Sequence, residues 1–223
     1  MRMLNTLALA GVLFAPLPLL AQDSDAPSGH ECAATVRGLR GEAVSFSLLF
    51  DSKGNPAGSS ASWRPPQEGD PGRGDLTRPD VTLWITFDTV TARSIGRPVD
   101  AQVSVSVFSP LRARQAPGKL AARLAGFSGN YRFGEAAFAP MTSFASDADT
   151  SLPGSAQVSQ SIPMPQPLPQ WLDVQILSKK GRLALSTRFA LNGPASRDAL
   201  FTQAWANAQS AAADPRSCAP NWD

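Results

Sequence analysis

The sequence is poor in the side chains on which most enzyme active sites depend. Its 223 residues include one histidine, His30, together with two cysteines and one tyrosine. Ser-His-Asp and Cys-His catalysis both need a histidine held beside the nucleophile. Zinc sites need several histidine or cysteine ligands close together. We therefore predict neither histidine-dependent catalysis nor a zinc site, and the sequence points to no cofactor.

A strong excess of charge is missing, and so are long apolar runs beyond residue 20. The formal net charge is +2, which argues against nucleic acid as a partner because such proteins carry a clear basic excess. After residue 20 no stretch approaches the roughly 18 consecutive apolar residues of a membrane-spanning helix. We expect no transmembrane segment in the mature chain.

The first 21 residues have the layout of a secretory signal peptide. Arg2 precedes an apolar run over residues 7–20, and Ala21 follows as the expected cleavage position. An uncleaved N-terminal anchor is the alternative. Arginine far outnumbers lysine, and the chain is rich in alanine, glycine and proline. This composition is typical of GC-rich bacteria. Export would then place the chain in the periplasm or the medium.

The two cysteines lie near the two ends of the mature chain. Cys32 and Cys218 most simply pair with each other in an oxidising compartment. The bridge predicts that the two ends meet in space, as is common in one domain. We expect a flexible leader over 22–31, a single β-rich domain over 32–218 and a short tail over 219–223.

Alternation of apolar and polar residues predicts a mainly β fold. Period-2 patterns and turn residues indicate strands at 42–50, 59–63, 81–90, 102–108, 171–177 and 182–191. Segment 111–138 fits helix or strand, whereas 64–80 and 145–161 read as long loops. An apolar stripe over about 196–213 predicts one amphipathic helix, with Ser196 as its cap and Asp198 in its first turn. The expected architecture is an antiparallel β-sandwich or partly open barrel with this helix packed on it.

Charged residues fall into two blocks of opposite sign. Residues 101–134 contain no acid, and residues 133–178 contain no base but four acids: Glu135, Asp147, Asp149 and Asp173. Such blocks form a dipolar surface, or cancel each other across the fold. In the first case the basic block would contact an anionic partner through Arg112, Arg114, Lys119, Arg123 and Arg132.

Two further features suggest sites. Trp84 faces away from the main apolar row of its strand, so it packs a second layer or is available to a ligand. Asp147 and Asp149 form an Asp-x-Asp pair that lacks the remaining oxygen ligands of a calcium loop. They are weak candidates for a metal site or for glycosidase carboxylates, and a solvated acidic loop is the simpler interpretation.

The sequence therefore favours a non-enzymatic binding or scaffolding module of the bacterial envelope. Its partner would be an unidentified envelope component or protein. Two alternatives stay open: a carboxylate-dependent glycan hydrolase, and an enzyme inhibitor that inserts a loop such as 64–80 into its target. A structure distinguishes them by showing whether acidic side chains share one cleft.

Overall fold

The structure is a computed structural model, and it describes residues 29–68, 78–88, 96–109, 116–142, 144, 148–151, 153–214 and 218–221. Several expectations fall outside these residues: the signal peptide, most of the leader, and the side chains of Arg112, Arg114 and Asp147. Among the described residues, no helix is both long and apolar enough to span a membrane.

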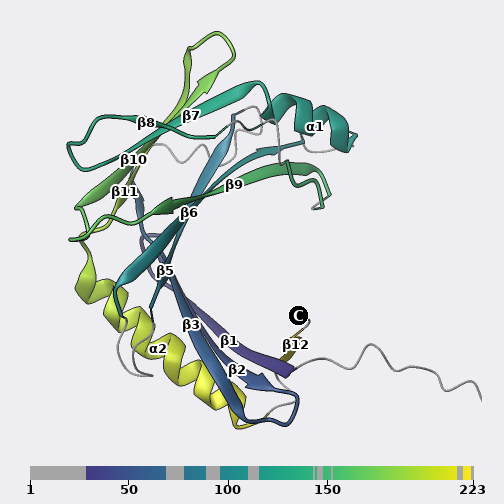
Figure 1. Cartoon of the computed structure of the whole chain (residues 1–223), viewed down its shortest axis with the longest axis vertical. Coiled ribbons are helices and arrows are strands. Elements are labelled where there is room, and N and C mark those ends of the chain that lie inside the picture. Colours follow the sequence, from purple (N-terminus) through teal and green to yellow (C-terminus); the bar gives the residue numbers. More distant parts are fainter. Residues whose placement is uncertain are drawn as a thin grey trace, which may run out of the picture.

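Two antiparallel sheets form the fold, as expected (Figure 1). Sheet A has seven strands in the order β12-β1-β2-β3-β5-β6-β9, and sheet B has five in the order β4-β11-β10-β7-β8. The strands of sheet A are β1 (Gly29–Arg37), β2 (Ala43–Asp51), β3 (Pro56–Arg64), β5 (Asp80–Phe87), β6 (Pro98–Phe108), β9 (Ser155–Pro163) and β12 (Ala219–Asn221). Those of sheet B are β4 (Gln67–Glu68), β7 (Phe127–Phe133), β8 (Ala139–Pro140), β10 (Trp171–Ser178) and β11 (Leu183–Ala190).

One continuous core lies on a single face of sheet A. The alternate residues of β5 (Val81, Leu83, Ile85 and Phe87) are buried there, together with the valines of β6. Sheet B contributes Leu172, Val174 and Ile176 of β10 to the same cluster. Alternation places every second side chain on this face, so the sequence pattern of these strands is confirmed. The result is a mainly β, sandwich-like fold.

Helix α2 (Pro194–Ala212) covers the core face over β1 and β2 (Figure 1). Phe201, Ala204 and Ala208 are buried, and the ring of Phe201 meets Phe46 of β2 edge-on at 5.4 Å. The expected stripe is therefore correct. The expected cap is wrong: Gly193 is the N-cap and Pro194 starts the helix. Proline is well suited to that first position.

Ser196 has a different contact from the one expected. Its hydroxyl donates to Oε1 of buried Glu42 at 3.1 Å, while the Arg40 backbone N–H donates to Oε2 at 2.8 Å. Because the helix begins two residues earlier than expected, Asp198 lies beyond its first turn. These contacts tie the start of α2 to the β1–β2 connection.

The disulfide Cys32–Cys218 is present, with the two Cα atoms 4.5 Å apart. Cys32 lies on β1, and Cys218 directly precedes β12, which pairs with β1. The chain thus closes on itself, as predicted. The last three residues of the expected leader, 29–31, belong to strand β1. Residues 219–221 of the expected tail belong to strand β12. His30 stacks on Phe50 with 4.6 Å between ring centroids, since the two are register partners.

The structure resolves one segment that the sequence left open and corrects one that it predicted. The ambiguous stretch 111–138 contains helix α1 (Pro117–Leu124), strand β7 and part of the β8 connection. The expected loop over 145–161 instead contains most of β9. Its polar appearance comes from alternation: Ala156, Val158 and Ile162 are buried, and the intervening serines and glutamine lie on the opposite face.

Candidate functional site: a charge cluster on the outer face of sheet B

Register alone brings three charged side chains into one row across sheet B. Asp173 of β10 pairs with Arg132 of β7 on one side and with Arg188 of β11 on the other. Neighbouring β10 residues Leu172 and Val174 point into the core, so Asp173 points to the outer face. Cross-strand partners on one face lie within about 5.5 Å at Cβ, which places both arginines within reach of the carboxylate.

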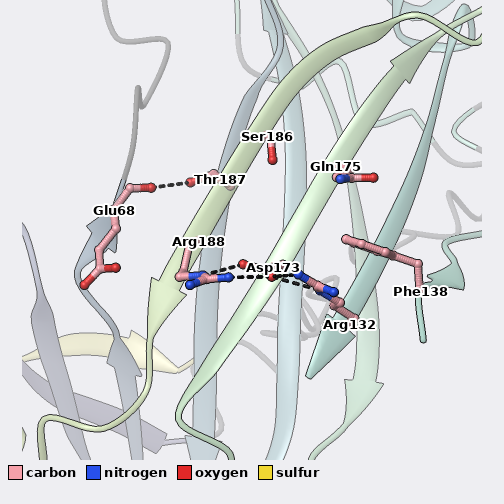
Figure 2. Close-up of a pocket in the computed structure, with 8 residues that line it drawn as sticks. All are labelled: Glu68, Arg132, Phe138, Asp173, Gln175, Ser186, Thr187 and Arg188. Atoms are coloured by element: carbon pink, nitrogen blue, oxygen red, sulfur yellow. Dashed lines mark hydrogen bonds and ion pairs between the residues drawn. The ribbon is translucent and has the colours of Figure 1, made fainter. Parts of the chain in front are cut away.

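The Asp173 carboxylate holds both guanidinium groups through short contacts (Figure 2). Arg188 approaches through Nε to Oδ1 at 2.7 Å and through Nη2 to Oδ2 at 3.0 Å. Arg132 places Nε and Nη2 each 2.9 Å from Oδ2. Such forked, charge-assisted pairs are the strongest ordinary hydrogen bonds in proteins. We call Arg132, Asp173 and Arg188 the charge cluster.

Electrostatics fix the protonation of the cluster. The hydrogen bond from Arg188, and after it the one from Arg132, hold the pKa of Asp173 below its ordinary value, although burial of the carboxyl acts in the opposite direction. The same hydrogen bond raises the pKa of Arg188. Asp173 is only 7% exposed. The cluster is therefore a buried anion between two cations and carries one net positive charge.

Aromatic rings hold the two guanidiniums in place from the side. The Arg132 Cζ atom lies 4.7 Å from the Phe138 ring centroid, and the Arg188 Cζ atom lies 4.7 Å from that of Trp171. Cation–π contacts of this kind add to the ion pair and restrict the side chains. The side chains of Arg132 and Arg188 remain 29% and 42% exposed, so part of each still faces solvent.

The cluster forms one wall of a hollow of about 340 Å³. Gln175 and Ser186, partners in the next row of the β10–β11 register, lie beside it, and Glu68 of β4 lies next to Arg188 as its register partner (Figure 2). Glu68 also meets Arg40 at 3.6 Å. Each guanidinium uses Nε and Nη2 on Asp173, and among the described residues Nη1 of neither has a hydrogen-bond partner. The hollow thus offers cationic donors beside a neutral amide, a hydroxyl and the Glu68 carboxylate.

The three described members of the basic block predicted from the sequence do not lie together in the hollow. Arg132 lies in the hollow, paired with Asp173 of the acidic block. Lys119 is exposed on α1, and Arg123 donates through Nη1 to the Phe108 carbonyl at 2.9 Å. Neither lines the hollow. A shared anionic-partner surface over the whole block stays a prediction, since Arg112 and Arg114 lie outside the described residues.

Asp149 occupies a turn beside β9. Its Oδ1 accepts the Ser151 backbone N–H at 2.8 Å, and this bond lowers its pKa. Its backbone pairs with that of Gln157. Within the described ranges, no group of three or more histidine, cysteine, aspartate or glutamate side chains is placed to hold a metal ion. The weak metal and glycosidase interpretation of Asp147 and Asp149 gains no support from this turn.

Arg188, Gln175, Ser186 and Glu68 were missed by the sequence reasoning. The hairpin prediction over 171–191 contained a usable signal. A hairpin that pairs residue 172 with 189 also places Asp173 opposite Arg188, on the polar face of both strands. The pairing of β7 with β10 has no comparable signal, because 37 residues separate the two strands.

Comparison with protein-family models, curated proteins and solved structures found no significant match. Function is therefore inferred from the geometry of the site.

Proposed function

We propose that this chain is a non-catalytic, exported binding module of the cell envelope. It holds a carboxylate group of an acidic peptide or protein partner in the hollow beside the charge cluster. The observation that carries the proposal is the buried Asp173 carboxylate, which fixes Arg132 and Arg188 by short contacts and, within the part of the chain that the structure describes, leaves Nη1 of both without a protein partner. The disulfide supports the export part because such bonds persist in oxidising compartments.

The charge of the cluster favours one carboxylate as the bound group. Within the charge cluster, two guanidiniums and one carboxylate leave a single positive charge for an incoming carboxylate, although Glu68, the register partner of Arg188, lines the same hollow and offsets part of that charge. Arginine matches the planar geometry of a carboxylate better than lysine does. Gln175 and Ser186 supply neutral hydrogen-bond donors for the adjoining part of the ligand. Arginine and aromatic side chains together are also typical of the centres of protein interfaces.

The same geometry speaks against a hydrolase that uses Asp173. A general acid needs a raised pKa, and the pKa of Asp173 is lowered. A nucleophile needs a free oxygen, and both oxygens of Asp173 accept guanidinium donors. Glu68 lines the same hollow, but the only other carboxylate among the described lining residues is Asp173. The inhibitor alternative gains no specific support, because residues 69–77 lie outside the described ranges.

Arg132→Lys tests the proposed contact. Lysine keeps the charge but loses the planar fork, so we expect affinity for a carboxylate probe to fall about tenfold, the usual scale for one charge-assisted hydrogen bond. The probe is N-acetyl-glutamate N-methylamide, titrated by NMR in the millimolar range. Arg182→Lys is the matched control, because Arg182 is exposed at the β10–β11 turn and does not line the hollow. Equal affinity of the two variants would refute the contact.

Export predicts a defined mature N-terminus. Expressed with its full leader in a Gram-negative host, the protein should be recovered from the periplasm or medium with Gln22 as its first residue. Intact mass and N-terminal peptide mapping check this. Replacing two leucines of the apolar run over 7–20 with arginine should retain the uncleaved chain in the cytoplasm. Recovery of full-length, uncleaved protein from the unaltered leader would contradict export by this route.

A further inference from the structure

One face of sheet A carries a second feature that the proposed function does not use. The core, α2 and sheet B all lie on the apolar face, and in Figure 1 the sheet curves from β9 at the top to β1 and β12 below, with α2 on the outer side of the curve. The other face therefore lines the inside of the curve. We call it the hydroxyl face.

Small neutral polar side chains dominate the hydroxyl face. Alternation and register place there, in neighbouring strands, Ser45 and Ser47 of β2, Ser60 and Ser62 of β3, Thr82, Trp84 and Thr86 of β5, Gln102, Ser104 and Ser106 of β6, and Gln157, Ser159 and Ser161 of β9. The charged residues of these strands on this face are Asp51, Arg64, Asp80 and Asp100, and they lie at or near strand ends. An exposed sheet face normally carries polar side chains; the centre of this face is neutral and rich in hydroxyls, and Ser47, Ser104 and Ser106 within it are buried.

Hydrogen bonds already link part of this face across strands. The Ser104 and Ser159 hydroxyls are 2.7 Å apart, Ser106 donates to the Gln157 side chain at 3.2 Å, and Gln157 donates to Ser159 at 3.2 Å. Ser161 donates to Asp100 at 2.9 Å. A connected network holds its members in fixed orientations, so less ordering entropy is lost when a ligand uses their remaining donors and acceptors.

Trp84 is a large aromatic side chain within this field and is half-buried, whereas Phe108, on the same face of β6, lies at the end of its strand. Trp63 lies beneath Arg197 and Trp171 beneath Arg188. Among the described residues, no guanidinium or aromatic ring covers Trp84. Its register partner is exposed Gln102, and its neighbour on β5 is Thr82, the partner of Ser104. An open indole thus lies beside neutral hydrogen-bonding groups.

From this arrangement we infer that the hydroxyl face binds an uncharged glycan chain, with a sugar ring stacked on Trp84. Charge complementarity selects this occupant. A nucleic acid or a strongly charged protein would find no counter-charge at the centre of the face. A second copy of the chain would need an apolar interface core, and Trp84 alone does not supply one. A polyhydroxylated, uncharged chain matches the neutral donors and acceptors with its hydroxyls and the indole with its apolar ring face.

The experiment uses the mature protein with chitohexaose, cellohexaose and maltohexaose as three separate probes. Isothermal titration and tryptophan fluorescence should report binding of at least one of them. Trp84→Ala should weaken that binding tenfold or more, the scale of a buried aromatic anchor. Ser159→Glu should also weaken it, because it places a charge on the neutral face without touching the core. Leu183→Ala, at an exposed position of sheet B, should leave it unchanged, and near-UV circular dichroism checks each fold.

The result also separates this site from the charge cluster. Glycan binding should be the same at 50 and 500 mM NaCl, whereas carboxylate binding at the cluster should weaken as salt screens it. Absence of binding to all three probes at millimolar concentration would overturn the inference. So would binding that neither Trp84→Ala nor Ser159→Glu reduces, because the glycan would then lie elsewhere. Either failure would leave the carboxylate proposal unaffected, because a separate titration tests it.

Discussion

Replacing both Cys32 and Cys218 with alanine is expected to lower the free energy of unfolding by roughly 5 kcal/mol, the value that the chain-entropy model gives for a loop of this length. The bridge joins residues 186 apart in sequence, so it restricts almost the whole unfolded chain. In the native state it fixes the three-residue strand β12 against β1. Urea unfolding followed by circular dichroism measures the difference from the unaltered protein.

Reduction of the unaltered protein provides the control for this prediction. Dithiothreitol should destabilise it by a similar amount and should have no effect on the double variant. Mass mapping without reduction should show the Cys32 and Cys218 peptides linked. A loss below about 1 kcal/mol would mean that the bridge constrains the unfolded chain far less than the model holds. A free thiol at Cys32 in the exported protein would contradict the disulfide itself.

Asp173→Ala should cost about 2–3 kcal/mol of stability. Removing one partner of a fully buried ion pair costs about 3–5 kcal/mol; the lower figure applies here because Arg132 and Arg188 both reach solvent. The variant leaves Arg132 and Arg188, on the two strands that flank β10, without the carboxylate that separates their charges. Asp198→Asn is the matched control, since among the described residues that exposed carboxylate forms an ion pair with its neighbour Arg197 alone, and it should cause no measurable change.

The effect of Asp173 should depend on pH. The arginine hydrogen bonds lower its folded-state pKa, so the unfolded chain takes up this proton at a higher pH than the folded chain. The stabilisation is therefore fully present above the unfolded value of about 3.9 and is lost as pH falls through the folded pKa. Urea unfolding should show that the unaltered protein and Asp173→Asn differ less in free energy of unfolding at pH 2–3 than at pH 7. An equal difference in free energy of unfolding at both pH values would contradict the assigned role of this carboxylate.

Much of the fold was predictable because burial on one face imposes period-2 alternation. The apolar rows of β2, β5, β6 and β11 are visible in the sequence, as is the stripe of α2. Strand β9 escaped notice because its outward positions are serine and glutamine and its inward positions include the small Ala156. Low hydrophobicity hid a strand that only its pairing with β6 reveals. The start of α2 was misplaced because Ser196 is a typical cap, yet Pro194 already satisfies the first helical position.

The candidate site was less accessible to sequence reasoning. Cys32 and Cys218 could be paired by counting, and the orientation of Trp84 followed from alternation. The charge cluster depends on strand order in sheet B, which places β7 and β11 on either side of β10. Arg132 was noted as part of a basic block and Asp173 as part of an acidic one. Their contact was not foreseen, since it depends on pairing between strands distant in the sequence.

The most direct test of the central claim observes the two arginine side chains while a carboxylate is added. In ¹⁵N-labelled mature protein, the Nε–H signals of Arg132 and Arg188 are assigned through the two Arg→Lys variants. N-acetyl-glutamate N-methylamide is then titrated, with the glutamine analogue as the uncharged control. We expect both Nε–H signals to shift saturably with the glutamate probe, less at 500 mM NaCl, and not with the glutamine probe. Nε–H chemical shifts that do not change, or that change equally with both probes, would contradict carboxylate binding at this cluster.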